Sequence, residues 1–463
     1  MMKTKKAAGA RKKIKKRKKH FKINTFLYAV FIITISTAGM IFFSGTYFQG
    51  LIRNENFMIP SPTLQPDATA IISGVITAAA VPTKIPEKDL PAKVVLTSVG
   101  DILLHASVIT GGLQKDGTYN YDYAFEHVTG YFKNSDYALA NFEGTMDGPP
   151  YTGYPGFCAP DPIAAALMNA GIRMVTTANN HAYDRGLDGI KRTPEVFAKE
   201  GVEVIGTRSD ASDPSFRIIQ INGIKIGFTG YTYETVGSQT GKSLNGIALS
   251  AEAAGLVDSF NYYRAESYSE DLQEMGDRVS QMKEAGAECI VFQIHWGTEY
   301  KNVSNAKQKE LAQFLADKGV DVIFGHHPHV LQEIDVLKSS ANGRNTLVYY
   351  SLGNFLSNML YSSQGTNGYA EDAMIARVEI MRREDGTINI TKGEYIGTYV
   401  YKDKTTSKTI HKIIPIAEAL KSPDKFGVGN IRELIENSMV RIKKVLSGSD
   451  GTKNGILIGE HGQ

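Results

Sequence analysis

Cysteine is almost absent from this sequence. Its 463 residues include two cysteines, Cys158 and Cys289, too few for a disulfide framework or a four-cysteine zinc site. One disulfide between them is possible, but we expect two buried thiols. Proline is also scarce, with 16 residues against 45 glycines, while 42% of residues are hydrophobic. This composition excludes a wholly disordered, collagen-like or polytopic membrane chain.

Acidic residues are missing from the first 22 positions, which contain twelve lysines and arginines. The formal net charge of +3 therefore hides two oppositely charged parts, because the remaining chain has 39 basic and 48 acidic residues. Lysine-rich runs can bind nucleic acid. Here the basic run directly precedes an apolar segment, so we interpret it as a cytoplasmic tail that contacts anionic lipid, and we expect no nucleic-acid partner.

Charged residues are also absent from positions 23–52, whose centre reads TFLYAVFIITISTAGMIFF. About 20 apolar residues in a helix cross the ~30 Å hydrocarbon core of a membrane. A cleaved signal peptide is the alternative, but this run is longer than the ~7–15 apolar residues of such peptides. We therefore predict one uncleaved transmembrane anchor, with the N-terminus in the cytoplasm and the main domain outside the cell membrane.

The rest of the chain divides into three parts. Residues 53–92 are rich in proline and threonine and have the composition of an extended linker. Residues 93–400 contain short β-branched runs that alternate with helix-like segments, which is typical of an α/β domain with largely parallel strands. Residues 401–463 form a C-terminal extension whose stretch IRELIENSMVRIKKVL predicts one packing helix.

Polar side chains follow the predicted strands of the main domain. Ligands bind at the carboxyl ends of strands in open α/β sheets, so these residues are candidates for a common site. Carboxylates mixed with imidazoles and an amide favour one or two divalent Zn, Mn or Fe ions over calcium. Taken singly, an aspartate after glycine can cap a helix, and a lone histidine can belong to the core. The strand-end residues are Asp101, Glu143, Asn180, His181, His295, His326, His327, His329 and Asn354.

The motifs VGDILLH, NFEG, ANNHAYDRG, HWGTEY, GHHPHVLQ and SLGNF, in this order, resemble the CapA-type bacterial capsule-synthesis proteins associated with poly-γ-glutamate. The resemblance extends from about residue 94 into the 370s. That family in turn resembles the calcineurin-like metallophosphoesterases, so the implied fold is a four-layer α/β/β/α sandwich that holds two metals, here preceded by one transmembrane helix.

The resemblance also implies roles for individual residues. Asp101 would bind the first metal, Glu143 would replace a bridging aspartate, and Asn180 would bind the second metal and take part in catalysis. His181 would donate a proton or stabilise the transition state. Whether His105 or His326 is a ligand stays open. The implied metal ligands are Asp101, Glu143, Asn180, His295, His327 and His329.

We assign substrate binding to Arg185 and Asn354, although Arg185 could equally form an ion pair with Asp184 or Asp188. The implied function is assembly of poly-γ-glutamate or a related envelope polymer. Its expected partners are the bacterial membrane and the anionic polymer or its synthase subunits. In the expected reaction, metal-activated water attacks an amide or phosphoester bond. A non-catalytic polymer-binding or export subunit and a generic metallophosphodiesterase are the alternatives. The acidic main part of the chain disfavours binding of polyanions, although a local pocket can override net charge.

Overall fold

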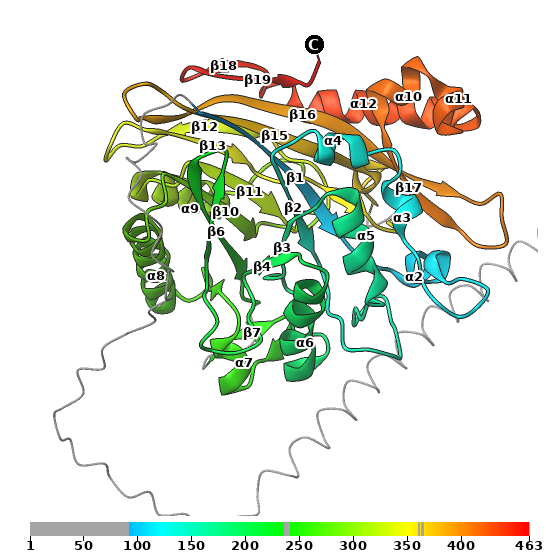
Figure 1. Ribbon diagram of the computed structural model, residues 1–463, viewed down its shortest axis with the longest axis horizontal. Coiled ribbons are helices and arrows are strands. Elements are labelled where there is room, and N and C mark those ends of the chain that lie inside the picture. The colour runs from blue at the N-terminus through cyan, green and yellow to red at the C-terminus, as the bar shows by residue number, and fades with distance from the viewer. Residues whose placement is uncertain (1–91, 236–240, 360–361, 363–364, 463) are drawn as a thin grey trace, which may run out of the picture. The chain divides into compact units, whose positions relative to one another are not determined.

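Two β-sheets lie at the centre of the structure (Figure 1). The computed structural model describes residues 92–235, 241–359, 362 and 365–462. The larger sheet has ten strands: β1 (Ala92–Ile102), β2 (Tyr137–Phe142), β3 (Met174–Thr176), β4 (Glu203–Ile205), β14 (Asn354–Leu356), β15 (Asp372–Arg382), β16 (Ile388–Asp403), β17 (Ile410–Pro415), β18 (Gly451–Lys453) and β19 (Ile456–Glu460).

The second sheet has seven strands: β5 (Arg217–Ile221), β6 (Ile224–Tyr233), β9 (Ser259–Phe260), β10 (Cys289–His295), β11 (Val322–His326), β12 (Ile334–Lys338) and β13 (Asn345–Tyr349). A separate two-stranded hairpin consists of β7 (Ser243–Leu244) and β8 (Ile247–Ala248).

Each large sheet has a parallel centre and antiparallel additions. Strands β1, β2, β3 and β4 are parallel in the larger sheet, as are β6, β10, β11 and β13 in the second. Strands β15, β16 and β17 pair antiparallel beside β1, and β5 and β12 are antiparallel edges of the second sheet. The predicted mixed α/β class is therefore confirmed, with more antiparallel pairing than the sequence indicated.

The helices follow the strands as the alternating pattern predicts. Two of the predicted helices, α5 and α9, end at Gly171 and Gly319, whose φ angles of 110° and 93° are left-handed and suit glycine. The helices are α2 (Ala106–Gly112), α3 (Asp122–Phe125), α4 (Thr129–Lys133), α5 (Pro162–Ala170), α6 (Gly186–Lys199), α7 (Ala251–Gly255), α8 (Ala265–Glu284), α9 (Ala306–Lys318), α10 (Ile416–Lys421), α11 (Pro423–Phe426) and α12 (Arg432–Leu446).

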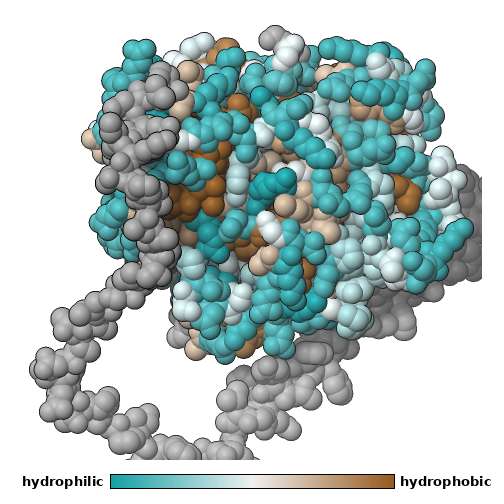
Figure 2. Space-filling model, viewed as in Figure 1, coloured by the Kyte–Doolittle hydropathy of each residue, from teal (hydrophilic) through white to brown (hydrophobic). Residues whose placement is uncertain are grey.

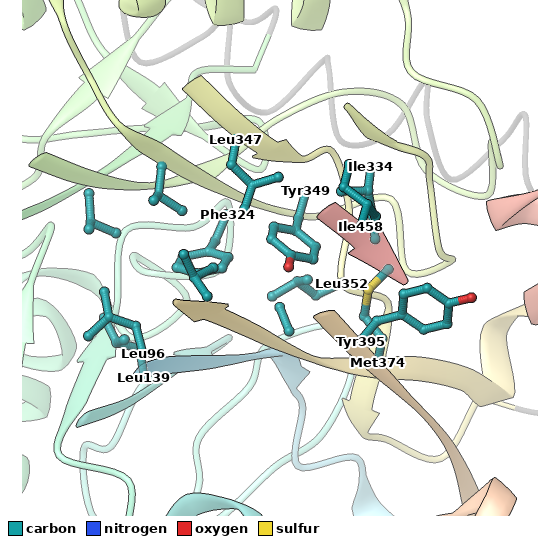
Figure 3. Packing of buried hydrophobic residues seen from close by; sticks show 14 of the residues in the cluster. Leu96, Leu139, Phe324, Ile334, Leu347, Tyr349, Leu352, Met374, Tyr395 and Ile458 are labelled. Carbon is teal, nitrogen blue, oxygen red and sulfur yellow. The ribbon is translucent and has the colours of Figure 1, made fainter. Parts of the chain in front are cut away.

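Three apolar clusters fill the spaces between these layers. The first lies between the two sheets and includes Leu96, Leu139, Phe324 and Leu347 (Figure 3). The second joins the other face of the larger sheet to helices that include α5 and α6, and the third joins the second sheet to α8 and α9. Along β15, Met374 faces the first cluster and the next residue faces the second, which is the two-residue period of a strand buried on both sides.

The C-terminal residues belong to the larger sheet. Strand β16 continues through position 400, where we expected the main domain to end, and β17 and β19 both pair with it. Helix α12 covers most of the stretch predicted as a packing helix, and its buried Ile442 belongs to the cluster between the sheets. The residues after position 400 therefore pack as part of the same unit.

Hydrophilic residues cover most of the face seen in Figure 2. Both cysteines are buried and neither forms a disulfide, as expected. The predicted basic tail (1–22), anchor (23–52) and linker up to residue 91 lie outside the described residues. Within the described ranges, no helix has the length and hydropathy needed to cross a membrane.

Candidate metal centre

Five neighbouring strands bring the predicted ligands together. Asp101 near the end of β1 stands beside Asn141 of β2 and beside Asn354 of β14 in the strand register. In the second sheet, His295 at the end of β10 stands beside His326 at the end of β11. Because the parallel strands of each sheet end at one edge, residues separated by more than 200 positions meet at the same place.

The side chains at this edge form three overlapping groups of potential metal ligands. Within each group the ligand atoms all lie within 4.8 Å of one another. Nearly all of these side chains are buried, and the exception is the exposed Glu299. The groups are Glu143 with His295 and His327, Glu299 with His327 and His329, and Asp101 with Glu143 and His329.

Glu143 lies at the centre of the cluster, and the hydrogen-bonding capacity of its carboxylate is not used by the described residues. It is 1% exposed, and neither of its carboxylate oxygens has a hydrogen-bond partner among the described residues. The Nε2 atoms of His295 and His329 each lie 3.6 Å from Glu143 Oε1, beyond hydrogen-bond range. Burial raises the pKa of Glu143 well above its usual range, and the charge of Asp101 raises it further. A buried carboxylate of this kind fits a bound cation.

Asp101 has more partners than Glu143. Asn141 Nδ2 donates to its Oδ1 over 2.8 Å, and His329 Nδ1 lies 3.2 Å from its Oδ2. Burial alone would raise the pKa of Asp101, but the adjacent rings of His326 and His329 bring it well below its usual range. Asp101 is therefore an ionised, fixed carboxylate in the cluster.

The histidines differ in charge. Burial lowers the pKa of His295 well below its usual range, and that of His327 to about 3, so both rings are neutral and can offer a lone pair. Burial opposes the charge of His329 as well, but the carboxylates of Glu143 and Asp101 raise its pKa to about 9. His329 is therefore the ring in this cluster that holds a positive charge, and it lies beside Asp101 and Glu143.

The three histidines of GHHPHV differ in their surroundings. His326 Nε2 lies 2.7 Å from Gln293 Oε1, and His326 belongs to none of the three ligand groups. His327 and His329 do belong to them, and both have left-handed backbone angles, with φ of 96° and 56°. This conformation is costly outside glycine, and such residues concentrate at functional sites.

Asn180 and His181 border the same site. Asn180 Oδ1 lies 2.8 Å from His295 Nε2, so these two atoms converge where the resemblance implies a second metal. His181 Nδ1 is 2.7 Å from Asp184 Oδ2, which leaves Nε2 as the ring nitrogen available to the adjoining cavity. The aspartate therefore orients the ring.

A cavity of about 370 Å³ opens onto this cluster. His105, Asn180, His181 and His329 are among the predicted residues that line it. Burial lowers the pKa of His105 to about 4, and its Nδ1 accepts a hydrogen bond from the backbone N–H of Asn358 rather than joining a ligand group.

Several lining residues escaped the sequence analysis, and two of them lie close to the candidate ligands or to His181. Glu299 lies in the motif HWGTEY, four positions after His295, and that spacing of an acid beside a ligand could have identified it. Asn245 lies in the β7–β8 turn, and its Nδ2 is 3.4 Å from His181 Nδ1. No local pattern distinguishes Asn245 from an ordinary turn residue.

The two residues assigned to substrate binding lie away from this cavity. Asn354 is fully buried, its Oδ1 lies 3.0 Å from His329 Nδ1, and its Nδ2 donates to the carbonyl oxygens of His329 and Ala370. Asn354 therefore positions His329 and does not line the cavity. Arg185 lines a neighbouring hollow, and it forms no ion pair with Asp184 or Asp188 within the described part of the chain.

Comparisons with known proteins agree with the sequence resemblance. The chain is 30% identical over 321 residues to the capsule biosynthesis protein CapA of Bacillus anthracis, covering 67% of this chain and 68% of that protein. It is 29% identical over 326 residues to the PGA biosynthesis protein CapA of Bacillus subtilis (strain 168), covering 67% and 75%.

Among solved structures, an NAD nucleotidase from Haemophilus influenzae matches 80% of this chain and 64% of its own, with 14% identity and a TM-score of 0.39. The calcineurin-like phosphoesterase YfkN from Bacillus subtilis matches 78% of this chain and 99% of its own, with 14% identity and a TM-score of 0.34. These TM-scores are too low to establish a shared fold. The family model described as bacterial capsule synthesis protein PGA_cap matches residues 95–359, more than half of the chain, and the protein belongs to this family.

Proposed function

We propose that this protein is a membrane-anchored, metal-dependent hydrolase that acts outside the cell membrane in the assembly of poly-γ-glutamate or a related envelope polymer. The observation that carries the proposal is the buried Glu143 carboxylate, whose two oxygens lack partners among the described residues while histidines surround it. Burying such a group costs free energy that either protonation of the carboxyl or a bound cation offsets, and the surrounding histidines supply further ligands for a cation. The helix–sheet–sheet–helix order of layers also agrees with the metallophosphoesterase-like sandwich that the motifs imply.

The donor set fits one or two divalent Mn, Zn or Fe ions, because it mixes imidazole nitrogens with carboxylate and amide oxygens. When bound, such ions polarise a carbonyl or phosphoryl oxygen and lower the pKa of a water molecule. The residues that would hold them are Asp101, Glu143, Asn180, His295, His327 and His329, with the exposed Glu299 as a further ligand from the cavity side.

His181 is suited to move a proton in this site. Its Nδ1 is held 2.7 Å from Asp184 Oδ2, and the backbone N–H of Phe157 donates to the same oxygen over 2.7 Å. The carboxylate favours the tautomer with the proton on Nδ1, so Nε2 at the cavity can accept a proton or, once charged, donate one to a leaving group. Asn180 would orient the substrate beside it.

The relatives and the N-terminal sequence support the proposed biological setting. The relatives are described as capsule and PGA biosynthesis proteins, and the uncharged run at positions 23–52 supports a single anchor. The polymer or its synthase subunits would then reach the site from outside the membrane.

The test uses the full chain purified in detergent. Elemental analysis should find a transition metal in the wild type, and the metal-loaded protein should cleave poly-γ-glutamate or a model phosphoester. Glu143→Gln should lose both properties, whereas Glu310→Gln, an exposed position on α9, should keep both. Absence of metal from the wild type would refute the site. Tight metal binding without turnover of either substrate would favour the non-catalytic polymer-binding subunit.

A further inference from the structure

A second hollow lies beside the metal cavity. Its volume is about 680 Å³, and its lining includes Tyr119, Tyr151, Tyr154, Thr152 and Arg185. Tyr154 also lines the metal cavity and is 75% exposed, so the two hollows meet at this ring. A ligand too long for the first cavity can therefore continue into the second.

The wall between the two hollows is the loop of residues 150–157. Backbone hydrogen bonds join Thr152 and Cys158 in both directions, at 3.0 and 2.8 Å. A side chain at Gly153 would place its Cβ 2.5 Å from the backbone nitrogen of Ala106, so the loop packs directly against the segment that carries His105. On the cavity side, the Phe157 ring lies edge-on to His181, with 4.8 Å between the ring centroids. The loop thus holds the two hollows in a fixed relation.

Arg185 supplies the positive charge of the second hollow. Its Nη2 donates to the carbonyl oxygen of Pro150 over 2.7 Å and to Thr152 Oγ1 over 3.2 Å. Its Nε is buried and has no hydrogen-bond partner, and no carboxylate of the described residues forms an ion pair with it. Part of this guanidinium is therefore uncommitted, in a chain whose residues after position 22 are acidic overall. Such a group favours an anionic ligand.

One short segment connects the two sites. Asp184 orients His181 in the metal cavity, and the next residue, Arg185, faces the second hollow. The distance between the reacting position and the anion-binding position is therefore set by adjacent residues. An arrangement of this kind suits a ligand with regularly repeated anionic groups.

We propose that the second hollow is a subsite for the neighbouring repeat unit of a linear polycarboxylate. One unit occupies the metal cavity, the chain passes over Tyr154, and Arg185 binds the carboxylate of the next unit. Tyr119 and Tyr151, whose rings meet edge-on at a 5.3 Å centroid distance, pack against the methylene groups between carboxylates. This subsite rests on the proposed polymer function but does not require catalysis.

The test measures equilibrium binding of fluorescent γ-glutamate oligomers of one, two, four and eight units to the full chain in detergent. For the wild type, affinity should rise between one unit and the longer oligomers, and γ-glutamine oligomers of equal length should bind more weakly. Arg185→Gln should lose about tenfold in affinity for the longer oligomers, as expected for a charge-assisted hydrogen bond, and should leave the monomer unaffected. Arg185→Lys should retain part of the preference for the charged oligomer. Arg383→Gln, an exposed arginine elsewhere, is the matched control.

Three results would overturn the subsite. One is an Arg185→Gln protein with unchanged length dependence and unchanged preference for charge. Another is an equal loss of affinity for all lengths with a lowered unfolding temperature, which would mean that Arg185 only braces the loop. The third is a wild type that binds no oligomer. By contrast, length-dependent binding in a wild type that holds no metal would refute the metal-dependent hydrolase and leave the subsite intact.

Discussion

Glu143 and Asp372 are both 1% exposed carboxylates, but their surroundings differ. Asp372 lies at the start of β15, and α12 supplies all of its side-chain partners: Ser438 Oγ donates over 2.7 Å, and Arg441 donates to both oxygens at 2.6 Å. Neither oxygen of Glu143 has a partner among the described residues. Burial alone therefore does not distinguish these two carboxylates, whereas their hydrogen-bond partners do.

The two sites also belong to different parts of the chain. Glu143 lies within the residues that match the family model, and Asp372 and its partners lie after the match ends at residue 359. Burial raises the pKa of Asp372 to about 6 despite Arg441, which reflects the cost of placing an ion pair inside the fold. The protein meets that cost at Asp372 with its own residues, and we expect it to use a metal at Glu143.

The largest expected effect is a loss of stability when Asp372 loses its partner Arg441. Arg441→Ala leaves Asp372 without its cation, and loss of one partner of a buried ion pair costs about 3–5 kcal/mol of the free energy of unfolding. Urea unfolding of the full chain would measure this loss, which should be equal with and without a chelator. Arg432→Ala is the control on the same helix, because its pairing with Glu436 is exposed and should contribute less than about 1 kcal/mol. If Arg441→Ala and Arg432→Ala lowered the free energy of unfolding equally, the ion pair at Asp372 would contribute no more than an exposed pair, and Asp372 could not serve as the stabilised counterpart of Glu143.

The next effect is a stabilisation by bound metal that should depend on Glu143. A free Mn or Zn concentration about 100 times the dissociation constant should stabilise the wild type by about 2.7 kcal/mol. Glu143→Gln should lose this gain and be no less stable than the wild type when both are metal-free, because the raised pKa keeps the metal-free Glu143 carboxyl protonated and a neutral amide of similar shape replaces it. The difference is read from unfolding temperatures with and without metal. A metal-free Glu143→Gln protein that is strongly destabilised would contradict the assignment.

A smaller effect should come from residues that hold the ligands. Asn354→Ala removes the amide that contacts His329, and losses of such supporting contacts typically lower metal affinity about 10–100-fold. Competition with a chromogenic chelator would measure the change. Asn389→Ala, on β16 with an amide bonded to Thr387, should leave the affinity unchanged. An unaltered affinity in Asn354→Ala would show that His329 is held by Asp101 alone.

The sequence alone determined the alternation of strands and helices, because apolar periodicity is a local pattern, and its motifs indicated the family through their resemblance to known proteins. It also identified the cluster formed by Asp101, Glu143, His295, His327 and His329. What it could not determine was where each side chain points. His326 continues β11 and contacts Gln293, whereas His327 leaves the strand with a left-handed φ of 96° and joins the cluster.

The tertiary structure alone decided which residues surround the cluster. Asn354 begins β14 where the sequence predicted the end of a strand, and its amide contacts are all internal. Asn245 reaches His181 from a hairpin with no distinguishing pattern. The partners of Asp372 come from a helix more than sixty residues later. Such contacts depend on how whole layers pack. A strand ending places a polar residue at the edge of a sheet, and only the packing of the other elements determines whether it meets a ligand, a cavity or another side chain.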